Sequence, residues 1–184
     1  MGATAIFYGP KIDIGILDAL GRRWQASIIQ FDFNLPERFD LTYVGMDNQL
    51  HRPYVVHRPL YGSIERFLAL LIVHHSGAFP VWLAPNQAIV IPITDRNLDY
   101  ARGVSDRMAA AGFRVEVDER AERMNAKIRD AQLQKIPYML VVGNMEEDVD
   151  SVSVWLHTNE DRGMTELSKF IDHLHAVVAR KSGL

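Results

Sequence analysis

Three side chains in the first half of the chain could bind a charged group or a metal ion. Lys11 and Arg66 could each bind a phosphate or a carboxylate, and the planar fork of the arginine matches either group through parallel hydrogen bonds. His57 could be a metal ligand, although a histidine at the end of an apolar strand more often donates one ring nitrogen to a backbone carbonyl. The chain contains no cysteine, so a thiolate-rich metal site is excluded.

Gln30 is a polar residue among apolar neighbours in a predicted strand. An amide is costly to bury unless both of its ends are hydrogen-bonded. The side chain of Gln30 therefore either bonds the backbone or faces a ligand cavity, and the residues alone favour the backbone.

The elements that must position these residues follow from hydrophobic periodicity. Residues 11–17 and 22–33 alternate as strands and form a hairpin around the turn at residues 18–21. Gly62 lets two backbone segments approach closely, and Ser63 is a strong N-cap residue. The sequence then predicts a helix whose apolar stripe seats it on the core, and the stripe consists of Ile64, Phe67, Leu68 and Leu71.

The second half alternates strands with helices. Strands are predicted at residues 88–93, 113–117, 138–142 and 151–156, and helices at residues 94–111, 122–135 and 165–180. The first of these strands is continuously apolar, which is typical of a strand buried on both faces of a parallel sheet. The fold class is therefore α/β (α+β overall), with an antiparallel β-rich first part and a small doubly wound α/β second part.

The connector between the two parts contains three large apolar side chains. Phe79, Trp82 and Leu83 lie in a stretch punctuated by proline, and they need burial. We therefore expect a packed linker rather than a flexible one. The boundary is placed near Pro85, so that the domains are residues 1–84 and 85–184.

The composition is that of an ordinary globular protein, with 48% hydrophobic and 23% charged residues. Its 184 residues suit one large domain or two small ones. No apolar run is long enough for a membrane span, and no charged segment followed by an apolar one begins the chain, so a cytoplasmic location is expected. The net charge of −3 excludes a globally basic domain, so a nucleic acid would have to bind a local patch.

One local basic cluster lies between residues 120 and 135, and it consists of Arg120, Arg123, Lys127, Arg129 and Lys135. A basic helix face is usually solvated surface, but the sign of its charge also suits RNA phosphate. Glu146 could accept hydrogen bonds from a base edge, and Trp155 could stack on a base or pack in the fold. The acidic run at residues 146–150 works against RNA binding.

Several separated motifs resemble those of a known family. His57-Arg58, followed by Gly62-Ser63-Ile64-Glu65-Arg66-Phe67, resembles the third signature motif of class II aminoacyl-tRNA synthetases, in the form of the threonyl-tRNA synthetases. Tyr8-Gly9-Pro10-Lys11, Trp24-Gln25 and Ile29-Gln30-Phe31-Asp32-Phe33 are similar to the catalytic core of that family in order and spacing.

The resemblance implies roles around the amino acid. Tyr8, Gln30 and Ser63 match positions that bind threonine, and His57 matches a ligand of a zinc ion (Zn2+) that coordinates the amino and hydroxyl groups of threonine. A site that bonds the hydroxyl group of its substrate rejects an analogue without that group far better than an apolar pocket does.

The resemblance also implies roles around the nucleotide. Lys11 and Arg66 match catalytic positions, Arg66 and Gln25 match positions that bind ATP, and ATP is used with Mg2+ as substrate. The implied reaction is an in-line displacement at the α-phosphorus, in which positioning and charge neutralisation carry most of the catalysis.

The second half resembles the anticodon-binding domain of several class II synthetases. The similarity is carried by Trp82-Leu83-Ala84-Pro85, Pro92-Ile93-Thr94-Asp95 and the stretch at residues 136–143. It implies that the tRNA is bound by Arg120, Arg123, Lys127, Lys135 and Glu146. The family usually carries arginines where this chain has Trp155-Leu156-His157, which weakens the expectation of anticodon recognition.

The resemblance thus implies the C-terminal part of a threonine–tRNA ligase, with threonine, ATP and tRNA(Thr) as partners and a homodimer as the full-length form. The first two class II motifs and the other zinc ligands are missing from this sequence, so the isolated chain is expected to be inactive and to bind zinc weakly. Two alternatives remain open. One is a non-catalytic synthetase-derived RNA-binding module, and the other is an unrelated two-domain α+β binding protein.

Overall fold

The computed structural model describes residues 8–181, and the chain divides into two compact units. The first unit is Met1–His74 and the second unit is His75–Leu184. The expected boundary at Pro85 lies further along the chain than this division, because Val81 and Ala84 of the connector are buried within the second unit. Residues 1–7 of the expected first domain lie outside the described residues.

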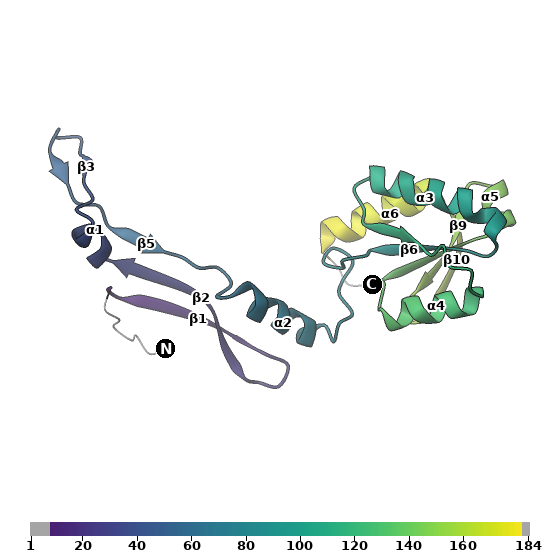
Figure 1. The fold of residues 1–184 in the computed structure, drawn as a ribbon, viewed down its shortest axis with the longest axis horizontal. Helices are drawn as coiled ribbons and strands as arrows, with labels where there is room; N and C mark the ends of the chain where they lie inside the picture. The colour runs from purple at the N-terminus through teal and green to yellow at the C-terminus, as the bar shows by residue number, and fades with distance from the viewer. Residues whose placement is uncertain (1–7, 182–184) are drawn as a thin grey trace. The chain divides into compact units, whose positions relative to one another are not determined.

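The first unit is built on an antiparallel sheet with the strand order β1-β2-β5 (Figure 1). The strands are β1 (Lys11–Leu17), β2 (Arg23–Asp32) and β5 (Val55–His57). The predicted hairpin of β1 and β2 is confirmed. Its turn is organised by Asp18, whose Oδ1 accepts the backbone N–H of Leu20 and whose Oδ2 accepts the indole N–H of Trp24, each at 2.9 Å.

The remaining elements of the first unit are short, apart from one helix. They are α1 (Asn34–Arg38), β3 (Tyr43–Val44), β4 (Leu50–His51) and α2 (Ile64–His74). The N-cap prediction is confirmed, since Ser63 Oγ accepts the backbone N–H of Arg66 at 3.2 Å. Gly62 has a φ of +71°, and a Cβ atom there would lie 2.9 Å from the carbonyl oxygen of Ala26, so the start of α2 lies against β2.

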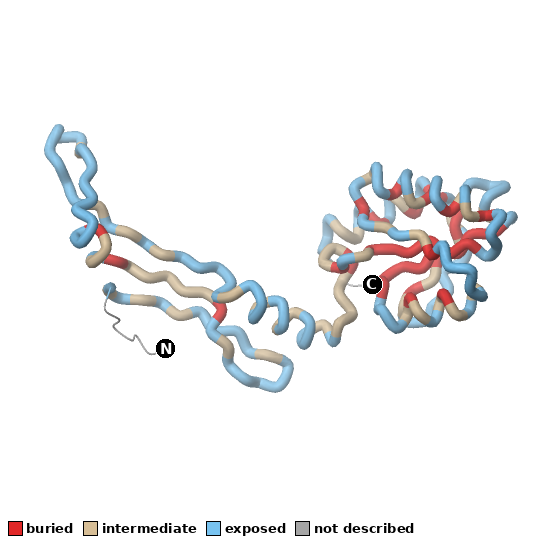
Figure 2. The backbone as a smooth tube through the Cα atoms, viewed as in Figure 1, coloured by how far each residue is buried: buried red, intermediate tan, exposed pale blue. Residues whose placement is uncertain are grey.

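The apolar stripe of α2 does not pack on a core among the described residues, so the predicted burial of this helix face is wrong. No residue of α2 is buried, and Ile64 and Leu68 are 74% and 50% exposed. Figure 2 shows few buried positions in the first unit. Periodicity determines which side chains share a helix face, but it does not determine whether another element covers that face.

The second unit contains a mixed sheet with the strand order β10-β9-β8-β6-β7. The strands are β6 (Ala88–Pro92), β7 (Val115–Val117), β8 (Tyr138–Val142), β9 (Ser151–Leu156) and β10 (Asp161–Glu166). β6 pairs in parallel with β7 and β8, whereas β8–β9 and β9–β10 are antiparallel. Every residue of β6 and β8 is buried, as expected for central strands.

Helices cover both faces of this sheet (Figure 1). They are α3 (Leu98–Ala110), which follows the 3₁₀ turn η1 (Asp95–Asn97), and α4 (Met124–Leu133), α5 (Asn144–Asp148) and α6 (Leu167–Arg180). α3 and α6 pack in one core cluster and α4 packs in the other, so the doubly wound arrangement is confirmed. β10 was not predicted, because its sequence lacks apolar alternation.

The connector packs on the second unit through Val81 and Ala84 and through polar contacts, whereas Phe79, Trp82 and Leu83, which were expected to need burial, are partly buried. The amide nitrogen of Gln87 donates to the carbonyl oxygen of Val81 at 2.9 Å. The guanidinium of Arg114 donates to the carbonyl oxygens of Ala84 and Pro85 at 2.8 and 3.0 Å.

Candidate functional site

Strand register brings predicted site residues of the first unit into one row. Lys11 of β1 is the register partner of Gln30 of β2, and Gln30 is in turn the partner of His57 of β5. Partners in adjacent strands point to the same face and lie within side-chain reach. The row therefore places a cation, an amide and an imidazole side by side on one face of the sheet.

A pocket of about 170 Å³ opens at this row. Its lining consists of Tyr8, Gln30, Asp32, Leu35 and His57. Three of these were predicted from the sequence to surround the amino acid or its metal. Of the two alternatives for Gln30, the structure favours the cavity.

The residue that sequence analysis did not assign is Asp32. It is 0% exposed, its Oδ2 lies 2.7 Å from His57 Nε2, and its Oδ1 accepts the backbone N–H groups of Asn34 and Leu35 at 2.8 and 3.0 Å. Burial raises the pKa of Asp32, but these hydrogen bonds outweigh it and hold the pKa below its ordinary value. The signal in the sequence was an acidic residue two positions after Gln30, on the same face of an apolar strand.

Asp13 connects the row to Gln25. Its Oδ2 lies 3.0 Å from the ammonium nitrogen of Lys11, and its Oδ1 accepts a hydrogen bond from Gln25 Nε2 at 2.5 Å. The side chains expected at the amino acid and at the nucleotide are thus held by one carboxylate. Ser63 and Arg66 stand at the start of α2, which Gly62 brings against β2, and Arg66 is exposed.

The donor set fits one ligand of a zinc site rather than a whole one. In the described part of the chain, no group of three or more His, Cys, Asp or Glu side chains could hold a metal ion. The contact of His57 Nε2 with Asp32 leaves Nδ1 as the nitrogen that can bind a metal. A histidine that binds a metal commonly donates its other ring N–H to a carboxylate, so the pair has the right chemistry.

In the second unit, one residue of the basic cluster is paired with carboxylates and another is buried. The guanidinium of Arg120 contacts Asp118 and Asp130, each at 2.7 Å, and these contacts raise its pKa. Lys127 is only 4% exposed, and its ammonium donates to the carbonyl oxygen of Asp118 at 3.0 Å. Lys127 therefore does not present its charge to solvent.

Two further predicted residues lie apart from these. Lys135 follows the C-terminal end of α4, and its ammonium donates to the carbonyl oxygen of Ser76. Glu146 caps α5, because its Oε2 accepts the backbone N–H of Gly143 at 3.0 Å, while Oε1 accepts the hydroxyl of Ser153 at 2.7 Å. The predicted tRNA-binding residues thus do not form a single basic face.

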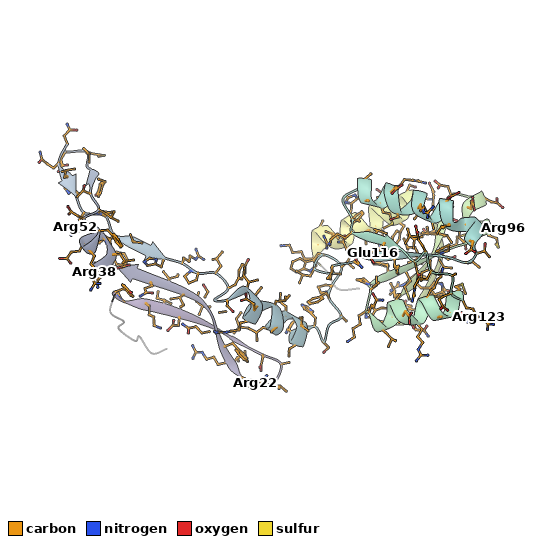
Figure 3. The ribbon with its side chains drawn as sticks, in the orientation of Figure 1. Arg22, Arg38, Arg52, Arg96, Glu116 and Arg123 are labelled. Carbon is orange, nitrogen blue, oxygen red and sulfur yellow. The ribbon has the colours of Figure 1, made fainter. Side chains whose placement is uncertain are left out.

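The structure brings other residues together at the carboxyl edge, by which we mean the segments that follow the parallel strands β6, β7 and β8. Arg96 follows β6, Arg123 precedes α4 after β7, and both are exposed (Figure 3). Ile93 after β6 and Met145 after β8 are exposed apolar side chains at the same edge. Arg96 was not predicted from the sequence, although it lies in the segment that follows a buried strand.

The connections that leave the two central strands diverge at this edge. After β6 the chain leads to β7 on one side, and after β8 it leads to β9 on the other side. The crevice between the carboxyl ends of such strands is where open α/β sheets bind their ligands. This edge is therefore the candidate nucleic-acid site of the second unit.

Trp155 packs in the fold but is only partly buried, so this packing does not exclude stacking on a base. Trp155 packs against a core cluster of buried residues that includes Ile89 and Met139. His157 donates its backbone N–H to Pro137, its ring Nδ1 is buried without a hydrogen-bond partner among the described residues, and desolvation lowers its pKa. The segment that departs from the expected pattern is therefore partly built into the fold.

Comparisons with protein families divide the chain in the same order. Residues 1–75 match the tRNA synthetase class II core domain (G, H, P, S and T), and residues 87–176 match the anticodon binding domain. No described helix has the length and apolar character needed to cross a membrane.

Similar proteins include the threonine–tRNA ligases of Acidobacterium capsulatum, 54% identical over 183 residues, and Aquifex aeolicus, 55% identical over 175 residues. The alignments cover 100% and 95% of this chain but only 27% of each relative, so the chain spans about a quarter of their length. A crystal structure of the RNA binding domain of threonyl-tRNA synthetase from Cryptosporidium parvum is similar with a TM-score of 0.85 and 38% identity. The match covers 94% of this chain and 44% of that one.

Proposed function

Because the chain belongs to the threonyl-tRNA synthetase family, we propose that it contributes part of the active site and the tRNA-reading domain of a threonine–tRNA ligase. The full-length enzyme activates threonine with ATP and transfers it to tRNA(Thr). The observation that carries this proposal is the pocket at the Lys11–Gln30–His57 row. Its groups suit a small polar amino acid that carries a carboxylate.

The chemistry of activation needs charge and position. A carboxylate oxygen of threonine attacks the α-phosphorus of ATP, and pyrophosphate leaves. Lys11 neutralises the charge on the amino-acid side, and the exposed fork of Arg66 binds a phosphate group of ATP, which is used with Mg2+. Gln25, held through Asp13 at a fixed place relative to Lys11, lies on the nucleotide side.

Selection of threonine depends on polar groups in the pocket. His57 would hold a zinc ion as one of its ligands, and the bound zinc would supply a Lewis acid for the amino and hydroxyl groups of threonine. The Tyr8 hydroxyl and the Gln30 amide bind the rest of the amino acid, whereas Ser63 caps α2 and is not among the residues that line the pocket. Valine matches the shape of threonine but leaves these groups unpaired, so it is rejected.

The second unit binds the anticodon at the carboxyl edge. Arg96 and Arg123 contact phosphates there, and Ile93 and Met145 offer apolar contact to base faces. Glu146 accepts a hydrogen bond from a base, because a carboxylate has more acceptor sites than the two contacts it makes.

Three predicted tRNA contacts take supporting roles in this proposal. Lys127 and Arg120 fix the segment at Asp118 that leads into α4. Lys135 binds the carbonyl oxygen of Ser76 in the connector.

The proposal is tested with the full-length enzyme that carries this segment. We expect threonine-dependent exchange of pyrophosphate into ATP, charging of tRNA(Thr), and rejection of valine that weakens in Gln30→Ala. A non-catalytic RNA-binding module, the alternative, shows tRNA binding without threonine-dependent exchange. Exchange that does not depend on threonine, or a Gln30→Ala variant with unchanged discrimination, contradicts the proposed pocket.

A further inference from the structure

The carboxylate of Asp32 contacts two separate segments of the first unit. Oδ1 accepts two backbone N–H groups at the start of α1, whereas among the described residues Oδ2 contacts only His57. Capping α1 requires one oxygen, so the second oxygen is dedicated to the imidazole. A carboxylate is costly to bury, and Asp32 is completely shielded from solvent in a unit that buries few other side chains. This placement indicates a constraint on His57 beyond the needs of the turn.

The contact determines which ring nitrogen of His57 carries the proton. A carboxylate only accepts hydrogen bonds, so Nε2 of His57, 2.7 Å from Asp32 Oδ2, is the donor. In a neutral imidazole the other nitrogen, Nδ1, then keeps its lone pair. The same hydrogen bond restricts rotation of the ring. His57 lines the pocket together with Tyr8 and Gln30.

From this geometry we infer that Asp32 is a positioning residue, which fixes the tautomer and the orientation of His57 so that Nδ1 binds zinc. This inference rests on the proposed role of His57 and extends it to the carboxylate that holds the imidazole ring. Carboxylates that hold a metal-binding histidine commonly contribute about 10- to 100-fold to metal affinity.

The test is the isosteric variant Asp32→Asn in the full-length enzyme that carries this segment. The amide oxygen can keep the backbone hydrogen bonds of Asn34 and Leu35, so the turn is preserved. The amide nitrogen then faces Nε2 of His57, and two donors cannot pair, so the proton of the ring moves to Nδ1. We expect the zinc dissociation constant, measured by competition with a chromogenic chelator, to rise about 10- to 100-fold.

A matched control exists in the same unit. Asp47 also contacts a histidine, with Oδ1 2.9 Å from His51 Nε2, and it also accepts a backbone N–H, from Gln49 at 3.1 Å. This pair does not line the pocket. Asp47→Asn is therefore expected to leave zinc affinity unchanged, and an equal loss in both variants overturns the inference.

A second measurement does not require that Asp32→Asn folds. The ¹⁵N spectrum of histidine-labelled, zinc-free wild-type enzyme, with the His57 signals assigned through His57→Gln, is expected to show the proton on Nε2. A proton on Nδ1 overturns the inference.

The outcomes separate the two proposals. If His57→Gln binds as much zinc as the wild-type enzyme, the zinc role of His57 itself is contradicted. If His57→Gln loses zinc but Asp32→Asn retains it, only the role of Asp32 is contradicted.

Discussion

At the scale of single residues, aspartates hold the polar side chains of this chain in place. Asp13 binds Lys11 and Gln25, and Asp32 binds His57. In the second unit the side chain of Asp118 binds Arg120, and its carbonyl oxygen binds a buried ammonium. The carboxylates of Asp13 and Asp32 each join groups that are separate in the sequence, so substitution of either aspartate should displace a side chain of the proposed site.

Arg66→Ala is expected to reduce activation of threonine by the full-length enzyme. The variant loses one charge-assisted contact to phosphate, which corresponds to about 2–4 kcal/mol of transition-state stabilisation. Pyrophosphate–ATP exchange kinetics measure the loss. Arg52→Ala is the control, because Arg52 is also exposed but pairs with Asp40 at 2.8 Å and has no role in the proposed site. Unchanged exchange in Arg66→Ala removes Arg66 from the site.

Asp118 is expected to make the stability of the chain depend on pH in the acid range. The hydrogen bond from Arg120 is the main cause that lowers the pKa of Asp118 below 3.8. A lowered pKa means that the contribution is complete above the unfolded value and is lost as the pH falls through the folded value. The difference in unfolding free energy between wild type and Asp118→Asn should therefore shrink below about pH 4. Urea unfolding at several pH values measures it, and a constant difference contradicts this role.

At the scale of elements, α4 separates exposed from buried charge. Arg123, at its N-terminal end, and Arg129 are exposed, whereas Lys127 is turned inward beneath Asp118. Of these three members of the basic cluster, Arg123 is a contact candidate at the carboxyl edge, Arg129 is a solvated side chain along the helix, and Lys127 is structural. The carboxyl edge, rather than the helix face, is where we expect tRNA.

Arg123→Glu is expected to weaken tRNA binding by the full-length enzyme and to flatten its dependence on salt, because fewer counterions are released when a phosphate contact is lost. Arg129→Glu is the matched control on the same helix, and it should change binding less. Filter binding across a range of salt concentrations distinguishes them. Equal effects of both reversals, or no effect of either, contradict a site at the carboxyl edge.

Lys127→Met is expected to act on stability instead. It removes the buried donor to the Asp118 carbonyl, which leaves a buried acceptor unpaired at a cost of about 1–3 kcal/mol. Thermal or urea unfolding of this chain measures the change. If the variant is as stable as wild type but binds tRNA more weakly, Lys127 is a tRNA contact and not a structural residue.

At the scale of the whole molecule, the two units differ in how far they bury their apolar residues. The second unit has two core clusters, whereas in the first unit apolar side chains of β1, β5 and α2 remain exposed (Figure 2). A group of exposed large apolar side chains such as this one is typical of a surface that binds another protein segment. The chain also spans only about a quarter of the length of its curated relatives.

The 184-residue chain on its own is therefore expected not to adenylate threonine. In the proposed site it supplies one zinc ligand and part of the charge that binds ATP, and partial charge neutralisation does not assemble the reacting groups. Threonine-dependent pyrophosphate–ATP exchange by the purified chain, compared with an Arg66→Ala chain as background, measures this. Exchange above that background contradicts the prediction.

The sequence by itself determined the local features of this protein. Features that depend on neighbours within a few positions could be predicted from local patterns. They are the alternation of residues 11–17, the cap at Ser63 and the apolar runs of β6 and β8. The motifs around Gln30 and Arg66 likewise indicated the family before any fold was known.

Only the tertiary structure decided which side chains meet and which are covered. The Lys11–Gln30–His57 row depends on strand register, and the contact of Asp32 with His57 joins segments 25 positions apart. Lys127 is buried, while Ile64 of a strongly apolar helix is exposed. Burial and register are properties of distant chain segments brought together, and a local pattern carries no information about what will cover it.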